Sequence, residues 1–209
     1  MAFMEGVRDS VPPGDPARPE GTILVADDEP YMVGMLSEML EGRYDVVAAT
    51  DGQTALDRLQ TSAGIDVVLL DRRMPGIGGD EVLARMRSRN DDRPVVMITA
   101  VDPDLDIADM RFDAYLVKPV RRAEVLEVVE TVRGRSEYDR TVRSLYSISA
   151  RISALEQNFS HNSLEATPEY RELCRRRAEL AESARETLDW LMERDEPSLV
   201  YRDVLSEFK

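Results

Sequence analysis

The chain has 209 residues, enough for one ordinary domain and a smaller second one, and 43% of the residues are hydrophobic, which is enough for a real core. Its 41 acidic and 27 basic side chains give a net charge of −14, which disfavours non-specific binding to nucleic acid or anionic lipid. The single Cys174 and single His161 exclude an internal disulfide framework and a multi-cysteine metal cluster, and they argue against a histidine metal site or a Ser–His–Asp triad.

Residues 1–20 are predicted to form a disordered leader. The stretch 11–19 contains five Pro or Gly residues in nine positions. The start of the chain lacks the basic and apolar regions of a secretory signal, and no apolar run approaches the length of a membrane span. We therefore expect a cytoplasmic protein that does not associate with membranes.

Five short apolar runs between 22 and 117 each end at a polar residue, which is typical of parallel strands buried on both faces. If all five strands are parallel, their last residues share one edge of the sheet, where open α/β sheets bind ligands. Lys118 is prominent at this edge, because the only other lysine is the C-terminal residue. The polar residues at these ends are Asp27, Asp28, Thr50, Asp71, Thr99 and Lys118.

Helical patterns alternate with these runs. One helix is expected between the first two runs, others open at Gly52 and Gly79, and a last one follows Pro119. The acid-rich segment 103–111 predicts only a weak helix. Five βα units over 21–133 predict an α/β fold, a doubly wound five-stranded parallel sheet of the flavodoxin-like order. The last helix has more apolar surface than one face needs, so we expect it to cover the C-terminal region or another subunit.

The pattern changes in the region 134–209. Apolar residues from Tyr138 to Phe159 recur every three or four positions, the 3.5-residue period of a coiled coil. Residues 160–167 break this pattern, and Thr167 and Pro168 suit the N-cap and first position of a second helix running to about Arg194. The sequence thus predicts an all-α helical hairpin, followed by a brief third helix after Pro197. In the second helix, the residues expected to face inward include Tyr170, Leu173, Ala181, Ala184, Leu188 and Leu191.

Residues 21–133 resemble a response-regulator receiver domain. The resemblance is carried by Asp27–Asp28, by Asp71 followed by Met74–Pro75–Gly76 and Gly79, by Thr99–Ala100 and by Lys118–Pro119. It implies that Asp71 accepts a phosphoryl group from a sensor histidine kinase. It also implies Mg²⁺ as the cofactor, bound directly by Asp28 and Asp71, by Asp27 through water and by the backbone carbonyl of Arg73.

The same resemblance assigns two further roles at the strand ends. Lys118 would pair with a phosphoryl oxygen as a compact charge, its bond to Pro119 being cis, and Thr99 would hydrogen-bond another oxygen. Tyr115 matches the family's switch aromatic, which turns inward when Thr99 moves; the alternative is an exposed strand tyrosine. Arg73 lies at the mouth of the expected site and either affects hydrolysis of the phosphoryl group or is a solvated charge.

The region 134–209 resembles the HalX domain, which follows receivers in halophilic archaea. Scarce lysine and abundant carboxylates are likewise typical of halophiles. From Gly134 onward there are 15 acidic and 12 basic residues, which gives little support for DNA contact. We therefore expect a homodimer or docking to a protein, and leave a DNA partner in transcriptional regulation open.

Two other functions compete with the phosphorylated switch. An aspartate-nucleophile, Mg²⁺-dependent phosphohydrolase also combines a strand-end Asp, a Thr and a Lys, but it places an acid two residues after the nucleophile, where this chain has Arg73. A receiver that serves only as an unphosphorylated scaffold would not need the complete set of Asp27, Asp28, Asp71, Thr99 and Lys118. We expect no enzyme activity beyond the chain's own phosphoryl transfer and dephosphorylation.

Overall fold

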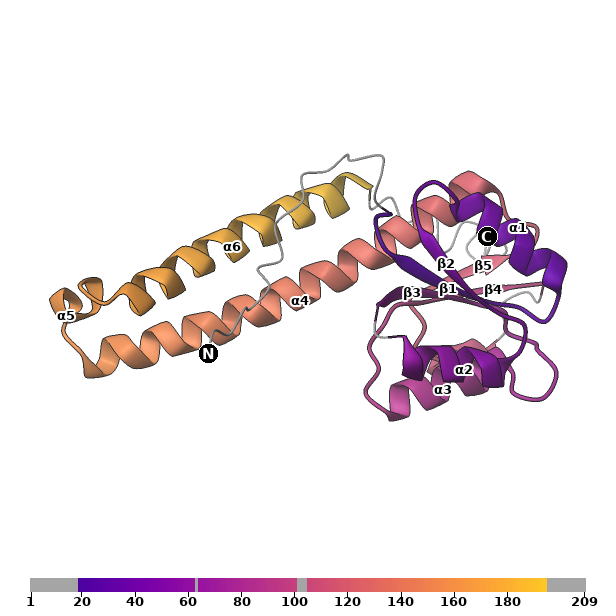
Figure 1. Cartoon of the computed structure of the whole chain (residues 1–209), viewed down its shortest axis with the longest axis horizontal. Coiled ribbons are helices and arrows are strands. Elements are labelled where there is room, and N and C mark those ends of the chain that lie inside the picture. Colours follow the sequence, from indigo (N-terminus) through magenta and orange to yellow (C-terminus); the bar gives the residue numbers. More distant parts are fainter. Residues whose placement is uncertain (1–18, 63, 101–104, 195–209) are drawn as a thin grey trace, which may run out of the picture.

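The computed structural model describes residues 19–62, 64–100 and 105–194. It has two parts, a compact α/β part and a long helical hairpin that projects from it (Figure 1). The expected leader, except for its last two residues, and the expected third helix after Pro197 lie outside the described residues. None of the described helices is both long enough and apolar enough to cross a membrane.

The α/β part contains a five-stranded parallel sheet in the order β2-β1-β3-β4-β5, which confirms the flavodoxin-like order predicted from the sequence. The order changes direction at β1, so that the ends of β1 and β3 flank the point where such sheets bind ligands. The strands are β1 Thr22–Ala26, β2 Asp45–Ala49, β3 Ile65–Leu70, β4 Val95–Thr99 and β5 Ala114–Val117.

Helices cover both faces of the sheet (Figure 1). α1 (Pro30–Leu40) and the first part of α4 (Arg122–Asn158) pack on one face, and α2 (Gly52–Thr61) and α3 (Gly79–Ser88) pack on the other. Each face has its own apolar cluster because alternate strand residues point to opposite sides. The buried residues of α1 are Val33, Leu36 and Leu40, whose spacing of three and four residues places them on one face of the helix.

One element differs from the sequence expectation, and another agrees with it. β2 is not buried on both faces, because it forms an edge of the sheet, and its residues Asp45 and Ala48 are exposed. After β4 the described chain forms only a short 3-10 helix, η1 (Leu105–Asp109), in agreement with the weak helix predicted there. Residues 103 and 104 of that predicted helix lie outside the described part.

α4 is one unbroken helix of 37 residues that leaves the sheet and continues as the first arm of the hairpin. The boundary expected between residues 133 and 134 lies inside it, and no break in the helix marks the position. A short α5 (His161–Glu165) forms the turn, and α6 (Pro168–Arg194) returns antiparallel along α4 (Figure 1). Pro168 occupies the first position of α6, as the sequence predicted.

The hairpin has a small core of its own, and Cys174 is half-buried against it. The predicted stripes are only partly right. Phe159 is 56% exposed because α4 has already ended at Asn158, and Ala181 and Leu188 of α6 are exposed because Leu180, Ala184 and Leu191 face α4 instead. The fully enclosed residues of this core are Ile148, Ile152, Leu164 and Tyr170.

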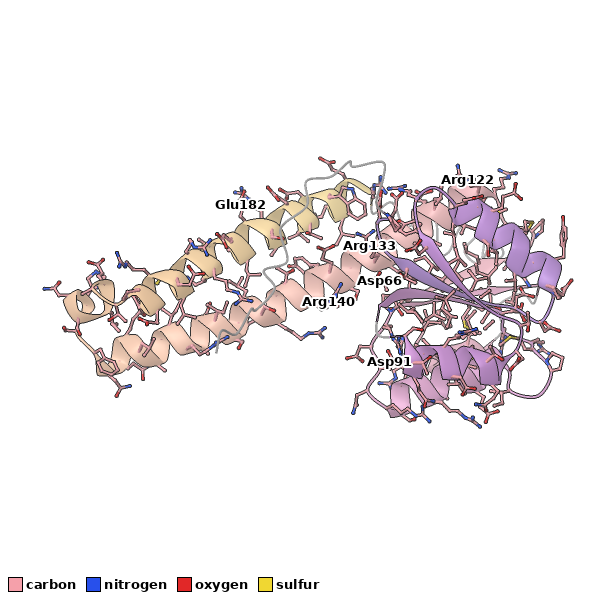
Figure 2. The ribbon with its side chains drawn as sticks, viewed as in Figure 1. Asp66, Asp91, Arg122, Arg133, Arg140 and Glu182 are labelled. Carbon is pink, nitrogen blue, oxygen red and sulfur yellow. The ribbon has the colours of Figure 1, made fainter. Side chains whose placement is uncertain are left out.

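The end of α6 is fastened to the α/β part. A Cβ atom at Gly134 would lie 2.6 Å from Cζ3 of Trp190, so the absence of a side chain on α4 makes room for the indole ring. Glu130 of α4 accepts hydrogen bonds from both Arg43 and Arg194, and Arg43 also pairs with Glu20. Arg133, beside this junction in Figure 2, also donates to Glu20. The end of α6 is therefore joined to α4 by the packing of Trp190, and to the α/β part by ion pairs that run through Glu130 and Arg43.

Candidate functional site

Four strand ends bring the predicted polar residues to one edge of the sheet. Asp27 follows β1 and Asp71 follows β3, and their backbone N–H groups donate to the carbonyls of Ala49 and Ala26. Thr99 ends β4, and its carbonyl accepts from the N–H of Lys118, which follows β5. Thr50 is the exception, because it lies exposed at the end of the edge strand β2.

Lys118 lies between the two buried carboxylates. Its Nζ donates to Oδ2 of Asp27 at 2.6 Å and to Oδ1 of Asp71 at 2.8 Å. The remaining oxygens are also engaged: Asp27 Oδ1 accepts from the N–H of Glu29 at 3.0 Å, and Asp71 Oδ2 from the N–H of Arg73 at 2.7 Å. The side chains of Asp27 and Asp71 are 2% and 6% exposed, so this ammonium neutralises charge where water has little access.

The electrostatics of this cluster favour the charged lysine. Burial alone would lower the pKa of Lys118, but the hydrogen bonds and charges of Asp27 and Asp71 outweigh it, and the pKa lies above its ordinary value. Lys118 is therefore an ammonium at every physiological pH. A charged donor held by two fixed carboxylates is suited to bind a further anionic oxygen if one of them releases it.

The metal ligands expected from the sequence lie directly after β1 and β3, which are neighbours in the sheet. Asp28 is half-buried beside Asp27, and the side chain of Arg73 is exposed, which leaves its carbonyl as the group of interest. Among the described residues, no three carboxylate, imidazole or thiol groups are arranged to hold a metal ion. Asp27 and Asp71 are both engaged by the ammonium of Lys118. The donor set is nonetheless all oxygen, the kind that Mg²⁺ prefers.

Thr99 and Tyr115 lie on the same face of the sheet. Thr99 is 1% exposed, and Tyr115 is 6% exposed in the cluster beneath α2 and α3, with its ring 5.6 Å from that of Phe112. The alternative of an exposed strand tyrosine is therefore wrong, because η1 and the loop to β5 cover this face with Ile107, Met110 and Phe112. The Lys118–Pro119 peptide bond is cis, as expected from the resemblance.

Comparison with known families identifies the domain that contains this edge of the sheet. The family model of the response regulator receiver domain matches residues 23–130, and that of the HalX domain matches residues 134–199. The chain belongs to the response-regulator receiver family. The receiver domain thus includes the whole sheet and the first turns of α4, and the HalX domain begins within the same helix.

Individual relatives agree with this assignment. A putative transcriptional regulator of Haloferax volcanii is 45% identical over 66% of this chain and 23% of its own length. The alkaline phosphatase synthesis transcriptional regulatory protein PhoP of Bacillus subtilis is 36% identical over 55% of this chain and 49% of its own. The chain thus spans half or less of these relatives. The Francisella response regulator 1452 receiver domain superposes with a TM-score of 0.53 at 28% identity, covering 56% of this chain and 99% of that structure.

The loop after Asp71 shows what sequence reasoning missed. Arg72, next to Arg73 in the sequence, is buried, and its Nε donates to both carboxylate oxygens of Asp80 on α3, at 3.1 and 3.2 Å. Gly79 allows this approach, because a Cβ there would overlap the backbone oxygen of Asp71. Arg72 lies in the loop after β3 and Asp80 lies on α3, so no periodic pattern within one element joins them in the sequence.

Proposed function

We propose that this chain is a two-component response regulator whose Asp71 accepts a phosphoryl group from the phosphohistidine of a sensor histidine kinase. A carboxylate oxygen of Asp71 attacks phosphorus, an O–P bond forms, and the P–N bond to the kinase histidine breaks. The observation that carries this proposal is the bridge from Lys118 to Asp71, which puts a cation beside the nucleophile at the ligand-binding edge of the sheet.

The neighbouring residues would receive the new group. When Lys118 exchanges a carboxylate for a phosphoryl oxygen, its charge offsets the repulsion between two anions. The hydroxyl of Thr99 is one strand away and can donate to a second oxygen. Exposed Ala100, next to Thr99, leaves the approach to the site open.

Mg²⁺ fits the donor set as cofactor, with Asp28, Asp71 and the carbonyl of Arg73 as direct ligands and Asp27 acting through water. When bound, it would neutralise negative charge shared by the carboxylates and the phosphoryl group. Because Lys118 donates to both Asp27 and Asp71, we expect the metal and the ammonium to compete for these carboxylates.

The signal would travel from this edge into α4. Thr99 and Tyr115 share a face of the sheet, and Lys118 lies only four residues before the first residue of α4. A shift of Thr99 and of β5 would change how Tyr115 packs and how α4 sits on the sheet. We propose that Tyr115 is the switch residue and that residues 134–209 are the output region.

Self-association through the helical hairpin is the output that we favour. The exposed surface of α4 and α6 carries Tyr146 and Met192, which are 74% and 70% exposed. The relatives' names favour a second output, transcriptional control, although the acidic balance of this region opposes direct DNA contact. The cytoplasmic location stays a prediction.

The phosphohydrolase alternative is less well supported. Such an enzyme needs an acid two residues after its nucleophile, and this position is occupied by Arg73, which is exposed. A steady release of phosphate from many small phosphate esters, at more than one turnover per chain, would favour it over the switch.

Phosphorylation can be tested by intact mass. After incubation with Mg²⁺ and acetyl phosphate, the wild type should gain one phosphoryl group and Asp71→Asn should gain none. Asp57→Asn, the same change at an exposed carboxylate on α2, is the control and should be labelled like the wild type. Labelling of the Asp71→Asn variant would show that another residue is the acceptor.

A further inference from the structure

α6 carries a second apolar stripe beside the one that packs on α4. Its members are four, three, four, three and four residues apart, the period of a coiled-coil seam. Leu188 and Met192 are 38% and 70% exposed, Ala178 and Ala181 are exposed, and only Cys174 is half-buried. We call this set the lateral stripe, made up of Cys174, Ala178, Ala181, Arg185, Leu188 and Met192.

The lateral stripe has small side chains in its first half and large side chains in its second half. Alanines occupy its first half, and Leu188 and Met192 occupy the second half. If two such helices pack antiparallel, small residues of one face large residues of the other, which is how facing positions fill space in a core. In a parallel pair, the large side chains would meet each other and the alanines would leave a gap.

The charged residues beside the stripe also differ between its two halves. Arg171 and Arg175 flank its first half, and Asp189 and Glu193 flank its second half. All four are exposed, and neither Asp189 nor Glu193 has a hydrogen-bond or ion-pair partner among the described residues. Arg175 pairs only within its own helix, with Glu172 and Glu179. An antiparallel arrangement therefore brings the basic half of one helix to the acidic half of the other.

We propose that a second copy of this chain packs on the lateral stripe, with the two α6 helices antiparallel and crossing near residue 183. In this register Ala178 faces the partner's Leu188, Cys174 faces the partner's Met192, and Arg175 lies beside the partner's Asp189. This inference rests on the self-association proposed above and adds its surface, its partner and its orientation.

The shape of the protein permits this arrangement. The receiver domain lies at the end of the hairpin where α6 finishes, and α5 lies at the other end (Figure 1). An antiparallel pair therefore places the two receiver domains at opposite ends, where they do not collide. Glu182 projects from the side of α6 away from α4 (Figure 2) and forms an ion pair with Arg185, so the arginine inside the stripe has a counter-charge.

The apolar residues of the lateral stripe can be tested by a substitution that introduces one charge. Leu188→Glu in the full-length protein should weaken self-association at least tenfold, measured by light scattering and sedimentation over a range of concentrations, with phosphorylated and unphosphorylated protein. Tyr146→Glu, at an exposed aromatic residue of α4, is the matched control and should leave the dissociation constant within about twofold. The reverse result would move the interface to α4 and overturn the proposal.

The orientation is tested by mixing two charge-reversal variants. Arg175→Glu places Glu beside the partner's Asp189, and Asp189→Arg places Arg beside the partner's Arg175, so each variant alone repels its own copy twice. Each should associate about tenfold more weakly than the wild type. An equimolar mixture should regain wild-type affinity, because both contacts in the mixed pair join opposite charges.

The outcomes separate this inference from the function on which it rests. A wild type that stays monomeric at all concentrations and in both phosphorylation states defeats self-association itself. A wild type that dimerises without regard to Leu188→Glu and both charge variants keeps self-association and overturns the lateral stripe. If the single variants are weakened and their mixture is not restored, the antiparallel register is wrong. Restoration by mixing cannot come from misfolding, since neither chain is repaired.

Discussion

The two halves of α4 belong to one helix but are held in different ways. Residues 122–134 pack against the sheet and α1, and bury Val125, Val128, Val129 and Val132 almost completely. The remaining turns pack on α6 and, near the end of the hairpin, on α5, and bury Ile148 and Ile152. Stability should therefore fall along the helix, because enclosed apolar area drops while the backbone hydrogen bonds continue. A region with few enclosed contacts can rearrange or exchange partners without unfolding the receiver domain.

The largest effect is expected at the ammonium that holds the receiver site together. Lys118→Met keeps the length of the side chain but leaves Asp27 and Asp71 facing each other without a cation, and should cost about 3–5 kcal/mol of unfolding free energy at pH 7 without divalent ions. Lys118→Arg, which keeps the charge, should cost less. Denaturant unfolding measures both, and equal stability of Lys118→Met and the wild type would refute the prediction.

The ion pairs of Lys118 also predict how the free energy of unfolding depends on pH. Because the pKa of Lys118 is raised in the folded state, its contribution is fully present below the unfolded pKa of about 10.4 and is lost as the pH rises through the folded value. The gap in stability between the wild type and Lys118→Met should thus be widest near neutral pH and narrow in alkali. A gap that widens in alkali would contradict the assignment.

A substitution in the core of the hairpin should cause the next largest loss of stability, and the loss should be confined to the hairpin. Ile152→Ala should cost about 2–5 kcal/mol by leaving a cavity between α4 and α6. Hydrogen exchange should accelerate in the hairpin and remain slow in β3 and in residues 122–134 of α4. Exposed Ser153→Ala is the control, with an effect within about 0.5 kcal/mol. Equal acceleration in β3 would mean that both parts unfold as a single unit.

The junction should respond less strongly. Gly134→Ala adds a good helix former, worth about 0.5–1 kcal/mol, but the new Cβ would press on Trp190. We expect the ring to move, the emission of this only tryptophan to shift to the red, and the stability gain to be lost. Gly34→Ala in α1 is the control, because nothing lies within 4 Å of its Cβ, and it should gain the full amount. Unchanged emission with a full gain at Gly134 would show that the junction is loose.

A helix cap in the receiver domain should give an effect of similar size. Asp51 accepts a hydrogen bond from the N–H of Thr54 at the start of α2, and Asp51→Ala should cost about 1 kcal/mol. This bond lowers the pKa of Asp51, so its contribution is present above the unfolded pKa and disappears as the pH falls through the folded one. Thermal unfolding at neutral and acidic pH measures it. A difference between variant and wild type that grows on acidification would contradict the cap.

Much of the fold follows from local patterns. Short apolar runs ending in polar residues located all five strands, and their alternation with helices indicated the doubly wound parallel sheet. The site residues were found because strand ends share one edge, although the bridge from Lys118 to Asp27 depends on tertiary distances. On α6, two adjacent stripes both contain apolar residues, so periodicity could not decide that Leu188 is outside and Leu180 inside. The role of Gly134, which provides room for Trp190, depends on a contact between two helices and could not be predicted from the sequence.

An unbroken helix has a mechanical consequence for the output. At 1.5 Å per residue, the 37 residues of α4 make a rod about 55 Å long, and its first residue comes four positions after Lys118. A tilt on the order of 5° at the first turn would sweep the far end through about 5 Å, the height of one helical turn. Ångström-scale repacking around Thr99 and Tyr115 would thus be magnified along the hairpin, and a displacement of one turn is enough to move an interhelical contact out of register.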